Sequence, residues 1–301
     1  MEEIITKPKK SFILGSIIIM RPINCLMGSL TVIIGILNTR TGSLFDILLL
    51  INIILGILTY FFIASSGMII NDIYDIEIDK INRPERPIPS GSVSLIQAKI
   101  LFFLTLSIGI IISIVHSLIF TLGVLNIILA LFFGFIGWLY SAWGKKQGFI
   151  GNIIVSISFS IGLIYGAILN SSIIPVYIYY FFLTSFFLLL SREIVKGCED
   201  IEGDKTKGIK TLAIKLGTKK AIVISIVFEI FAIIFFILPI FTNIINPTLF
   251  MIFMSFGLII VIIAIILSLR KNLERKHFKK ISLTLKMGAF FGLIAFIFAS
   301  L

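Results

Sequence analysis

The sequence predicts an all-α fold, namely a polytopic membrane protein with nine transmembrane helices in a single bundle around a central cavity. Of its 301 residues, 58% are hydrophobic and 14% are charged, and the mean hydropathy is +1.13, which soluble globular domains do not reach. The apolar residues form runs of about 20 or more, the length that a helix needs to cross a bilayer. These runs lie near residues 13–38, 46–70, 95–115, 118–142, 149–169, 173–195, 219–241, 247–269 and 282–301.

The first apolar run, from Phe12 past Val32, is predicted to be a membrane helix and not a signal peptide. It is longer than a signal-peptide core, and no small-residue cleavage site follows it. No Pro/Ser/Gly-rich linker or low-complexity tail interrupts the chain. We therefore assign residues 1–301 to one transmembrane domain.

The connections between the runs alternate in length and charge. Those after odd-numbered helices are short and contain only Arg40 as a basic residue; the second of them is expected at His116 and Ser117. Those after even-numbered helices are long and rich in Lys and Arg. Because cytoplasmic loops carry the excess of Lys and Arg, we expect the N-terminus and the even-numbered loops on the cytoplasmic side of a cell membrane, and the C-terminus outside.

Two acidic clusters on this predicted cytoplasmic side contain ten of the fifteen Asp and Glu residues. The first motif runs from Asn71 to Asp79, with Glu85 nearby, and the second runs from Glu199 to Asp204, with Glu193 before it. Such carboxylates could be solvated loop charges that pair with neighbouring Lys and Arg. Two clusters that begin where hydrophobic helices end, on the same side, indicate a site instead, because charged groups are costly beside a membrane.

The spacing within both motifs predicts a metal site. In a continuous helix the three aspartates of the first motif stand at i, i+3 and i+7 and share one face, and the two of the second stand at i and i+4. Like charges this close repel unless a cation neutralises them, and oxygen ligands without His or Cys suit Mg²⁺ or Mn²⁺. We expect two Mg²⁺ ions that bridge a diphosphate between the motifs. The predicted ligands are Asn71, Asp72, Asp75, Asp79, Asp200 and Asp204.

Basic and polar side chains near the motifs are predicted to bind phosphate oxygens. Arg192 and Lys196 stand at i and i+4 where a long apolar helix ends. Arg21 and Asn24 lie inside the first apolar run, where unpaired polar groups are costly, so we expect them to face the cavity. The full predicted set is Arg21, Asn24, Arg83, Arg86, Tyr140, Lys145, Lys146, Arg192 and Lys196.

Three of the polar features have structural explanations as well. Lys145 and Lys146 could simply anchor a helix at the membrane surface, and so could Tyr140, although an aromatic face could also shield a carbocation. Glu229 lies in the middle of the seventh predicted helix. An isolated acid inside the membrane suggests function, but a protonated, hydrogen-bonded structural glutamate fits at least as well.

The first motif and its Pro-rich continuation, residues 71–91, closely resemble the first signature of the UbiA superfamily of intramembrane prenyltransferases, N-D-x-x-D-x-x-x-D followed by R-P-[IL]-x-S-G. Residues 192–204 resemble the second signature, and the run from Arg21 to Asn24 resembles the start of the first helix. The resemblance covers essentially the whole chain. It implies Mg²⁺-dependent transfer of a prenyl group from a polyprenyl diphosphate, with Asp75 and Asp200 as catalytic residues.

The acceptor differs among members of this superfamily. Residues 192–204 most resemble the archaeal digeranylgeranylglyceryl phosphate synthases. This resemblance implies transfer from geranylgeranyl diphosphate to the hydroxyl of geranylgeranylglyceryl phosphate, which forms the second ether bond of archaeal membrane lipids. The surplus of Lys and Arg suits a lipid acceptor that itself carries phosphate. An aromatic quinone precursor or chlorophyllide is the alternative acceptor, because chlorophyll synthases share much of the first signature.

Other functional classes fit less well. Phosphatidyl-type alcohol transferases use a D-G-x-x-A-R run, and neither Asp-Gly nor Ala-Arg occurs in this sequence. A non-enzymatic transporter would have broken helices with polar residues at mid-membrane, whereas these helix centres are apolar apart from Glu229. The net charge of +11 follows the membrane topology, so the expected partners are membrane lipids and the two substrates and not nucleic acid.

Overall fold

The computed structural model describes residues 11–206 and 208–301, and the regular structure in these ranges is entirely helical. Nine stretches there are long and apolar enough to cross a membrane, which confirms the predicted fold class. They are α1 (Phe12–Met20) with α2 (Pro22–Leu37), α3 (Ile47–Tyr74), α5 (Leu95–Phe120), α6 (Leu125–Ala142), α7 (Phe149–Ser160) with α8 (Gly162–Asn170), α9 (Val176–Glu199), α12 (Thr218–Ile237), α13 (Pro247–Ser268) and α14 (Arg275–Phe298).

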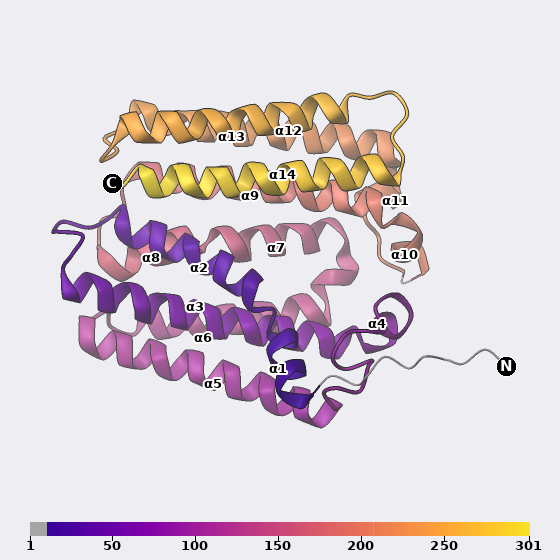
Figure 1. The fold of residues 1–301 in the computed structure, drawn as a ribbon, viewed down its shortest axis with the longest axis horizontal. Helices are drawn as coiled ribbons and strands as arrows, with labels where there is room; N and C mark the ends of the chain where they lie inside the picture. Colours follow the sequence, from indigo (N-terminus) through magenta and orange to yellow (C-terminus); the bar gives the residue numbers. More distant parts are fainter. Residues whose placement is uncertain (1–10, 207) are drawn as a thin grey trace.

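The long helices run side by side in two groups (Figure 1). In one group α3 packs against α2, α5 and α6, and in the other α9 packs against α12 and α14, while α13 packs against α14. Helices α7 and α8 join the groups, because α7 contacts α9 and α8 contacts α2. Aromatic side chains fill the second group, where the ring of Phe181 stacks on that of Phe296 with centroids 3.9 Å apart.

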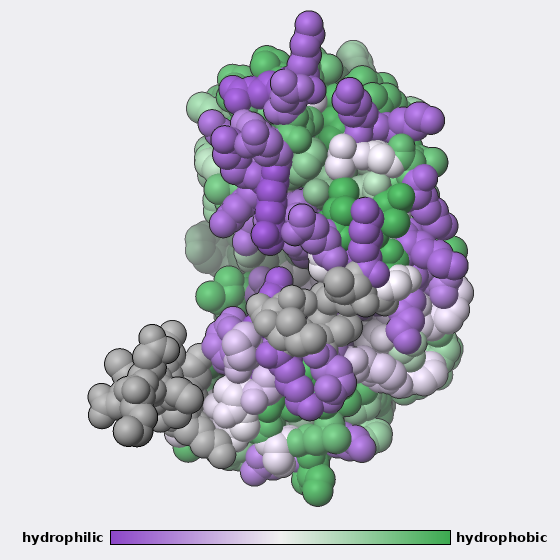
Figure 2. All heavy atoms as spheres, turned by 90° about the vertical axis from the view of Figure 1, so that its right-hand side faces the viewer, coloured by the Kyte–Doolittle hydropathy of each residue, from purple (hydrophilic) through white to green (hydrophobic). Residues whose placement is uncertain are grey.

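Both acidic motifs lie at the same end of the bundle, as predicted. The short helices α4 (Ile76–Asn82), α10 (Ile201–Thr206) and α11 (Leu212–Leu216) are all at this end, and the C-terminus is at the opposite one (Figure 1). Figure 2 shows hydrophilic side chains gathered on this face, with apolar side chains around the sides. We call it the polar end and the other the outer end.

Two of the predicted helices are interrupted. The run expected at residues 13–38 is divided at Arg21, whose left-handed backbone (φ 49°, ψ 58°) separates α1 from α2. Pro22 follows as the first residue of α2, and proline favours the first position of a helix over its interior because it has no backbone N–H. The run expected at residues 149–169 is likewise divided, at Ile161, into α7 and α8.

The boundary expected at His116 and Ser117 was wrong. Helix α5 continues to Phe120, and the chain turns at Thr121 (φ 53°) and Gly123 (φ 64°). Two polar residues do not end a helix when they are buried and bonded, and the Nε2 atom of His116 lies 2.7 Å from the Oδ1 atom of Asn52 on α3. Burial inside the bundle therefore sets this boundary.

The last helix begins earlier than the expected residue 282. Helix α14 starts at Arg275, and a capping box stabilises its first turn, in which the backbone N–H of Glu274 donates to Nδ1 of His277 at 3.0 Å. The basic residues at 275–280 therefore belong to the helix that crosses the membrane and form its polar end.

Neutral polar side chains connect four helices at the outer end. Asn52 on α3 contacts His116 on α5 and donates from Nδ2 to Oδ1 of Asn170 on α8 at 3.0 Å. Asn126 on α6 accepts from the hydroxyl of Tyr165 on α8 at 2.8 Å and donates to the carbonyl of Ser113 on α5 at 2.9 Å. We call these residues the outer cluster; its side-chain hydrogen bonds tie α3, α5, α6 and α8 together.

Candidate active site

The first motif lies where α3 leaves the apolar part of the bundle. Asp75 ends α3 and precedes α4, with φ −93° and ψ 3°, so the helix expected through residues 71–79 is interrupted at this residue. The interruption does not scatter the carboxylates. The exposed fractions of Asp72, Asp75 and Asp79 are 3%, 5% and 4%, so three acids are buried at the end of one membrane helix.

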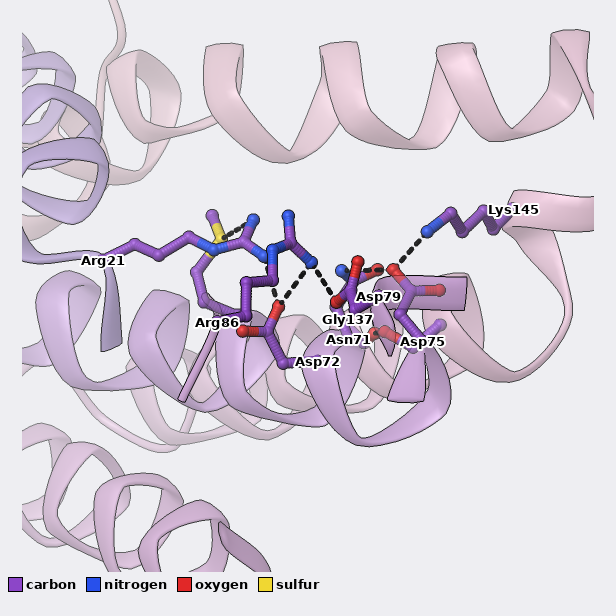
Figure 3. Close-up of polar contacts among 10 residues, drawn as sticks. Arg21, Asn71, Asp72, Asp75, Asp79, Arg86, Gly137 and Lys145 are labelled. Carbon is purple, nitrogen blue, oxygen red and sulfur yellow. Dashed lines mark hydrogen bonds and ion pairs between the residues drawn. The ribbon is translucent and has the colours of Figure 1, made fainter. Parts of the chain in front are cut away.

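Each of these carboxylates meets a cation (Figure 3). Arg21 pairs with Asp72, and the Nη1 atom of Arg86 lies 3.2 Å from Oδ1 of the same aspartate. Arg86 also pairs with Asp79, so its guanidinium connects α3 with α4. Buried charges are tolerated when they are paired and hydrogen-bonded, and this network provides the partners.

Asp75 has a separate set of partners on the other side of the motif. Lys145 reaches it from the direction opposite to Arg21 and Arg86, and the Nδ2 atom of Asn71 donates to its Oδ2 atom at 3.0 Å (Figure 3). Lys145 is on the short 3-10 helix Gly144–Gln147 that follows α6. The ammonium group of Lys145 points at the motif, which favours a role in substrate binding over simple anchoring at the membrane surface.

The three cations reach the motif by different local structures. Arg21 does so at the break between α1 and α2. Arg86 is held in the Pro-rich loop after α4, which folds back on itself through hydrogen bonds from the N–H of Ser90 to the Arg86 carbonyl at 2.9 Å and from that of Val93 to the Pro87 carbonyl at 3.0 Å. The loop therefore reaches the first motif through Arg86, and its three prolines keep residues 83–91 out of a regular helix.

A close approach of two glycines sets the distance between α3 and α6. A Cβ atom on Gly137 would lie 3.2 Å from the Cα atom of Gly67, so the two backbones touch at this level. Gly67 precedes Asn71 by one helical turn, and Gly137 precedes Lys145 by about two. The contact therefore positions the lysine against the first motif. Reasoning from the sequence did not find it, because glycine spacing within either helix gives no sign of the partner.

The second motif has the same local form as the first. Asp200 ends α9 and precedes α10, with φ −105° and ψ 14°, and the N–H of Asp204 donates to its carbonyl at 2.9 Å. Both aspartates are half-buried, in contrast to the fully buried aspartates of the first motif. Before them on α9, Arg192 pairs with its neighbour Glu193 at 2.8 Å.

Tyr140 lies between the two motifs. The charges of Asp75 in the first motif and of Glu193 and Asp204 at the second all act on its hydroxyl. Tyr140 is half-buried near the polar end of α6, five residues before Lys145.

Three predicted site residues lie away from this network. Arg83 and Lys146 are exposed on the polar end, and Asn24 is exposed one turn after Arg21 on α2. Among the described residues, no hydrogen bond or ion pair joins these three to the first motif, so their role in substrate binding stays a prediction. One residue that the sequence analysis did not predict does lie at the site. The sulfur of Met68 accepts a hydrogen bond from Nη1 of Arg21 at 3.8 Å.

Glu229 is hydrogen-bonded inside the bundle, which agrees with the structural interpretation that the sequence left open. Its Oε1 atom accepts from the hydroxyls of Ser191 at 2.7 Å and Ser225 at 2.9 Å, and its side chain is completely buried between α9 and α12. Ser191 directly precedes Arg192, so this contact fixes the part of α9 that leads to the second motif.

The described residues fit an Mg²⁺ ion only with help from a ligand. Within residues 11–206 and 208–301, no three Asp, Glu, His or Cys side chains converge on one point. Asn71 and Asp75 stand on successive turns and offer only oxygen donors to a metal. Mg²⁺ typically takes one or two carboxylates and completes its coordination with water and substrate phosphates, so this donor set suits it.

Two apolar spaces lie along the membrane-crossing helices. A groove of about 270 Å³ follows α2 from Ile23 to Ile33 and begins one turn from Arg21. A second, narrower cleft lies between α7, α9 and α14. Its lining residues are Phe159, Thr184, Ser185, Leu188, Leu189, Ala289, Gly292, Leu293 and Phe296. Both spaces are lined mainly by apolar side chains, with Ser29 in the first and Thr184 and Ser185 in the second as the polar exceptions.

Residues 29–296 match the UbiA prenyltransferase family. The chain belongs to this family. The relatives include the digeranylgeranylglyceryl phosphate synthase of Methanosphaera stadtmanae, which is 35% identical over 94% of this chain and 98% of that protein. The synthase of the same name from Saccharolobus solfataricus is 38% identical over 83% of this chain and 85% of that protein. These findings confirm the resemblance that the two motifs predicted.

Solved structures agree with the fold. A structure described for digeranylgeranylglyceryl phosphate synthase in membranes superimposes with a TM-score of 0.77 at 31% identity, over 96% of this chain and 98% of that one. A UbiA homologue from Archaeoglobus fulgidus, bound to GPP and Mg²⁺, superimposes with a TM-score of 0.67 over 94% of this chain and 99% of that one. At 18% identity the second comparison shows the shared fold alone.

Proposed function

We propose that this membrane prenyltransferase moves the geranylgeranyl group of geranylgeranyl diphosphate to the hydroxyl of geranylgeranylglyceryl phosphate. The proposal rests on one observation: the chain belongs to the UbiA prenyltransferase family, and digeranylgeranylglyceryl phosphate synthases are similar to it over nearly its full length. The charged network agrees with it, because three buried aspartates are each held by a cation that could bind phosphate instead.

The diphosphate of the donor would bind at the first motif. Arg21, Arg86 and Lys145 would turn from the aspartates to the phosphate oxygens. An arginine can donate two parallel hydrogen bonds to a phosphate, and a lysine binds it as a single positive charge. Asn71, Asp75 and Asp79, with Asp200 and Asp204 from the second motif, would hold Mg²⁺. When bound, Mg²⁺ would neutralise the charge of the diphosphate. We propose two such ions, one at each motif.

Asp72 is better suited to position an arginine than to bind metal. Its Oδ1 atom already contacts both Arg21 and Arg86. In this role it would present the two guanidinium groups to the phosphate. The proposed direct ligands are therefore Asn71, Asp75 and Asp79 in the first motif, with Asp75 and Asp200 as the central catalytic pair.

The apolar interior would hold the rest of the donor. The groove along α2 begins near Arg21 and is lined almost entirely by aliphatic side chains, so a prenyl chain could lie there with its diphosphate at the motif. As the carbon–oxygen bond to the diphosphate breaks, charge grows on its oxygens beside the cations, and the allylic carbon stays away from water. The acceptor hydroxyl then forms the new ether bond at that carbon.

The membrane would deliver both lipid substrates. We propose that the polar end faces the cytoplasm, since it carries nearly all the exposed Lys and Arg, and that the C-terminus lies outside. Residues 1–301 would form a single domain of this kind.

A competition assay tests the function. Purified protein is given geranylgeranyl diphosphate and Mg²⁺ with geranylgeranylglyceryl phosphate, 4-hydroxybenzoate and chlorophyllide together. We expect a diether phosphate product that disappears with chelator and returns with Mg²⁺. A prenylated aromatic or chlorin product would keep the reaction type and replace the acceptor, and no product with any acceptor would overturn the proposal.

A further inference from the structure

One face of α14 leads from the interior cleft to a lysine. Ala289 and Leu293 line this cleft, and Lys286 precedes them by three and seven residues. Positions i, i+3 and i+7 lie on one side of a helix, so Lys286 continues the lining toward the polar end. Its side chain is exposed although it belongs to a membrane-crossing helix.

The facing wall of the cleft also ends in cations. Leu188 and Leu189 of α9 line it, and Arg192 follows Leu188 by four residues, with Lys196 one turn further. Arg192 and Lys196 therefore continue the α9 wall in the same way that Lys286 continues the wall of α14.

The packing of α9 against α14 places these cations at the same level. Phe181 stacks on Phe296 near the outer ends of the two helices, which run in opposite directions. Lys286 is ten residues from Phe296 toward the polar end. Ser191, the residue before Arg192, is ten residues from Phe181 in the same direction. Both helices rise by the same distance per residue, so Lys286 stands at the same level along the bundle as Ser191 and Arg192.

Helix α2 contacts α14 only near the outer end of the bundle. The Nδ2 atom of Asn38, at the outer end of α2, donates to the carbonyl of Phe296 at 3.0 Å, and Ile34 and Leu293 belong to one packed core. From that contact α2 runs obliquely away from α14 toward the polar end (Figure 1). The side of α14 that carries Lys286 therefore borders the region into which α2 diverges.

Lys286 is a charged residue within a membrane-crossing helix, which is uncommon. A charged group within a membrane helix costs free energy, and a long stem can reduce the cost by reaching toward the surface. The exposed side chains that cover the lipid-facing side of α14 are apolar, such as Leu283 and Met287. Lys286 instead lies at the edge of the cleft, where a lipid that enters from the bilayer would bring its headgroup.

We propose that Lys286, together with Arg192, binds the phosphate monoester of the lipid acceptor; this inference rests on the proposed function. Two phosphorylated substrates need two anion sites, and the cations that surround the first motif account for one. The second would lie across the bundle, between α9 and α14. An arginine and a lysine provide a fork and a point charge for one phosphate group.

The test compares two acceptors that differ only in the phosphate. The kcat/KM values for geranylgeranylglyceryl phosphate and for geranylgeranylglycerol are measured for the unmodified protein, for Lys286→Gln and for Lys286→Arg. Lys280→Gln is the matched control, because it removes a charge from another face of the same helix. Thermal unfolding in detergent verifies that each variant is folded.

We expect Lys286→Gln to lower the preference for the phosphorylated acceptor at least tenfold, with the KM for geranylgeranyl diphosphate unchanged. Lys286→Arg should retain most of the preference, and Lys280→Gln all of it. An unchanged preference in Lys286→Gln, or a rise in the donor KM alone, would overturn the assignment while the proposed function stands. If the unmodified protein makes no diether, the proposed function itself fails, and direct titration with the phosphorylated lipid then tests whether Lys286→Gln weakens its binding.

Discussion

The two ends of this bundle each contain a buried polar cluster, and the clusters are built differently. At the outer end, Asn52, His116 and Asn126 are neutral and bond to polar groups on neighbouring helices. At the polar end, Asp72 and Asp75 are charged and are held by cations from the helix break, the Pro-rich loop and the turn after α6. The same helices α3 and α6 contribute to both clusters.

The difference teaches which cluster can exchange partners. Neutral donors and acceptors that bond to one another leave no net charge to attract an ionic ligand, so we expect the outer cluster to hold the helices together. The ion pairs at the polar end can exchange partners, because an anionic substrate can bind the cations and a metal ion can bind the carboxylates. Substitutions in the outer cluster should therefore lower the stability of the fold, and substitutions in the cluster at the polar end should lower the activity.

The largest effect is expected for Asp75→Asn. The change keeps the shape of the side chain but removes the charge that faces Lys145, so we expect Mg²⁺-dependent transfer to fall by about 100-fold or more with little change in melting temperature. Asp46→Asn is the control, because Asp46 caps the outer end of α3 and its loss should leave activity intact. Unchanged transfer in Asp75→Asn would remove this residue from the site.

A smaller effect is expected for Arg86→Gln. This substitution leaves Asp72 without one partner and Asp79 without its arginine, and removal of one member of a buried ion pair costs several kcal/mol. Since Arg86 retains some exposure, we expect a loss of about 2 kcal/mol in unfolding free energy and a higher KM for the donor. Thermal unfolding and steady-state kinetics measure both.

Adding Asp79→Asn to Arg86→Gln sharpens this test. The double variant no longer has the unpaired carboxylate at that position, so part of the lost stability should return. An Arg86→Gln protein as stable as the unmodified one would mean that the bridge between α3 and α4 does not hold the site.

The outer cluster should respond in the opposite way. Asn126→Leu leaves the hydroxyl of Tyr165 without its acceptor, so we expect a loss of about 1 kcal/mol in unfolding free energy, the usual scale for hydrogen bonds between membrane helices. Both KM values should stay the same. A change in either KM would show that the outer cluster influences the site and would break the division between the two ends.

The smallest effect is expected for Gly137→Ala. The added methyl group would lie 3.2 Å from the Cα atom of Gly67, so α6 must shift by a few tenths of an ångström and move Lys145 relative to Asp75. We expect a KM for the donor that is a few-fold higher. Gly134→Ala serves as the control, because its methyl group would meet only the end of the Leu106 side chain, which can move aside. Equal effects of both substitutions would assign them to general packing.

The sequence predicted those parts of the site that depend on local spacing. The aspartates of the first motif were expected on one helical face, and they remain together although the helix is interrupted at Asp75. Arg21 was expected to face inward because an unpaired arginine in an apolar run is costly, and it pairs with Asp72. Asn24, expected to face the cavity for the same reason, is exposed one turn further along α2, and its role stays a prediction.

The errors came from features that depend on neighbours distant in the sequence. His116 resembled a loop residue, but Asn52 on another helix satisfies it, so α5 continues through that position. Ser191 and Glu229 carried no detectable signal as a pair, although they meet between α9 and α12. In both cases a polar residue is tolerated in the membrane only because another helix supplies its partner.

The sequence by itself determined the membrane class, the nine helices, the shared side of the two motifs and the family, because hydropathy, loop charge and motif spacing are local properties of the chain. The tertiary structure alone decided which cation meets which carboxylate. Arg21 and Asp72 are 51 positions apart, and Lys145 and Asp75 are 70 positions apart. Such pairs form only once helix packing, as at Gly67 and Gly137, has fixed the distance between helices that the sequence leaves unconnected.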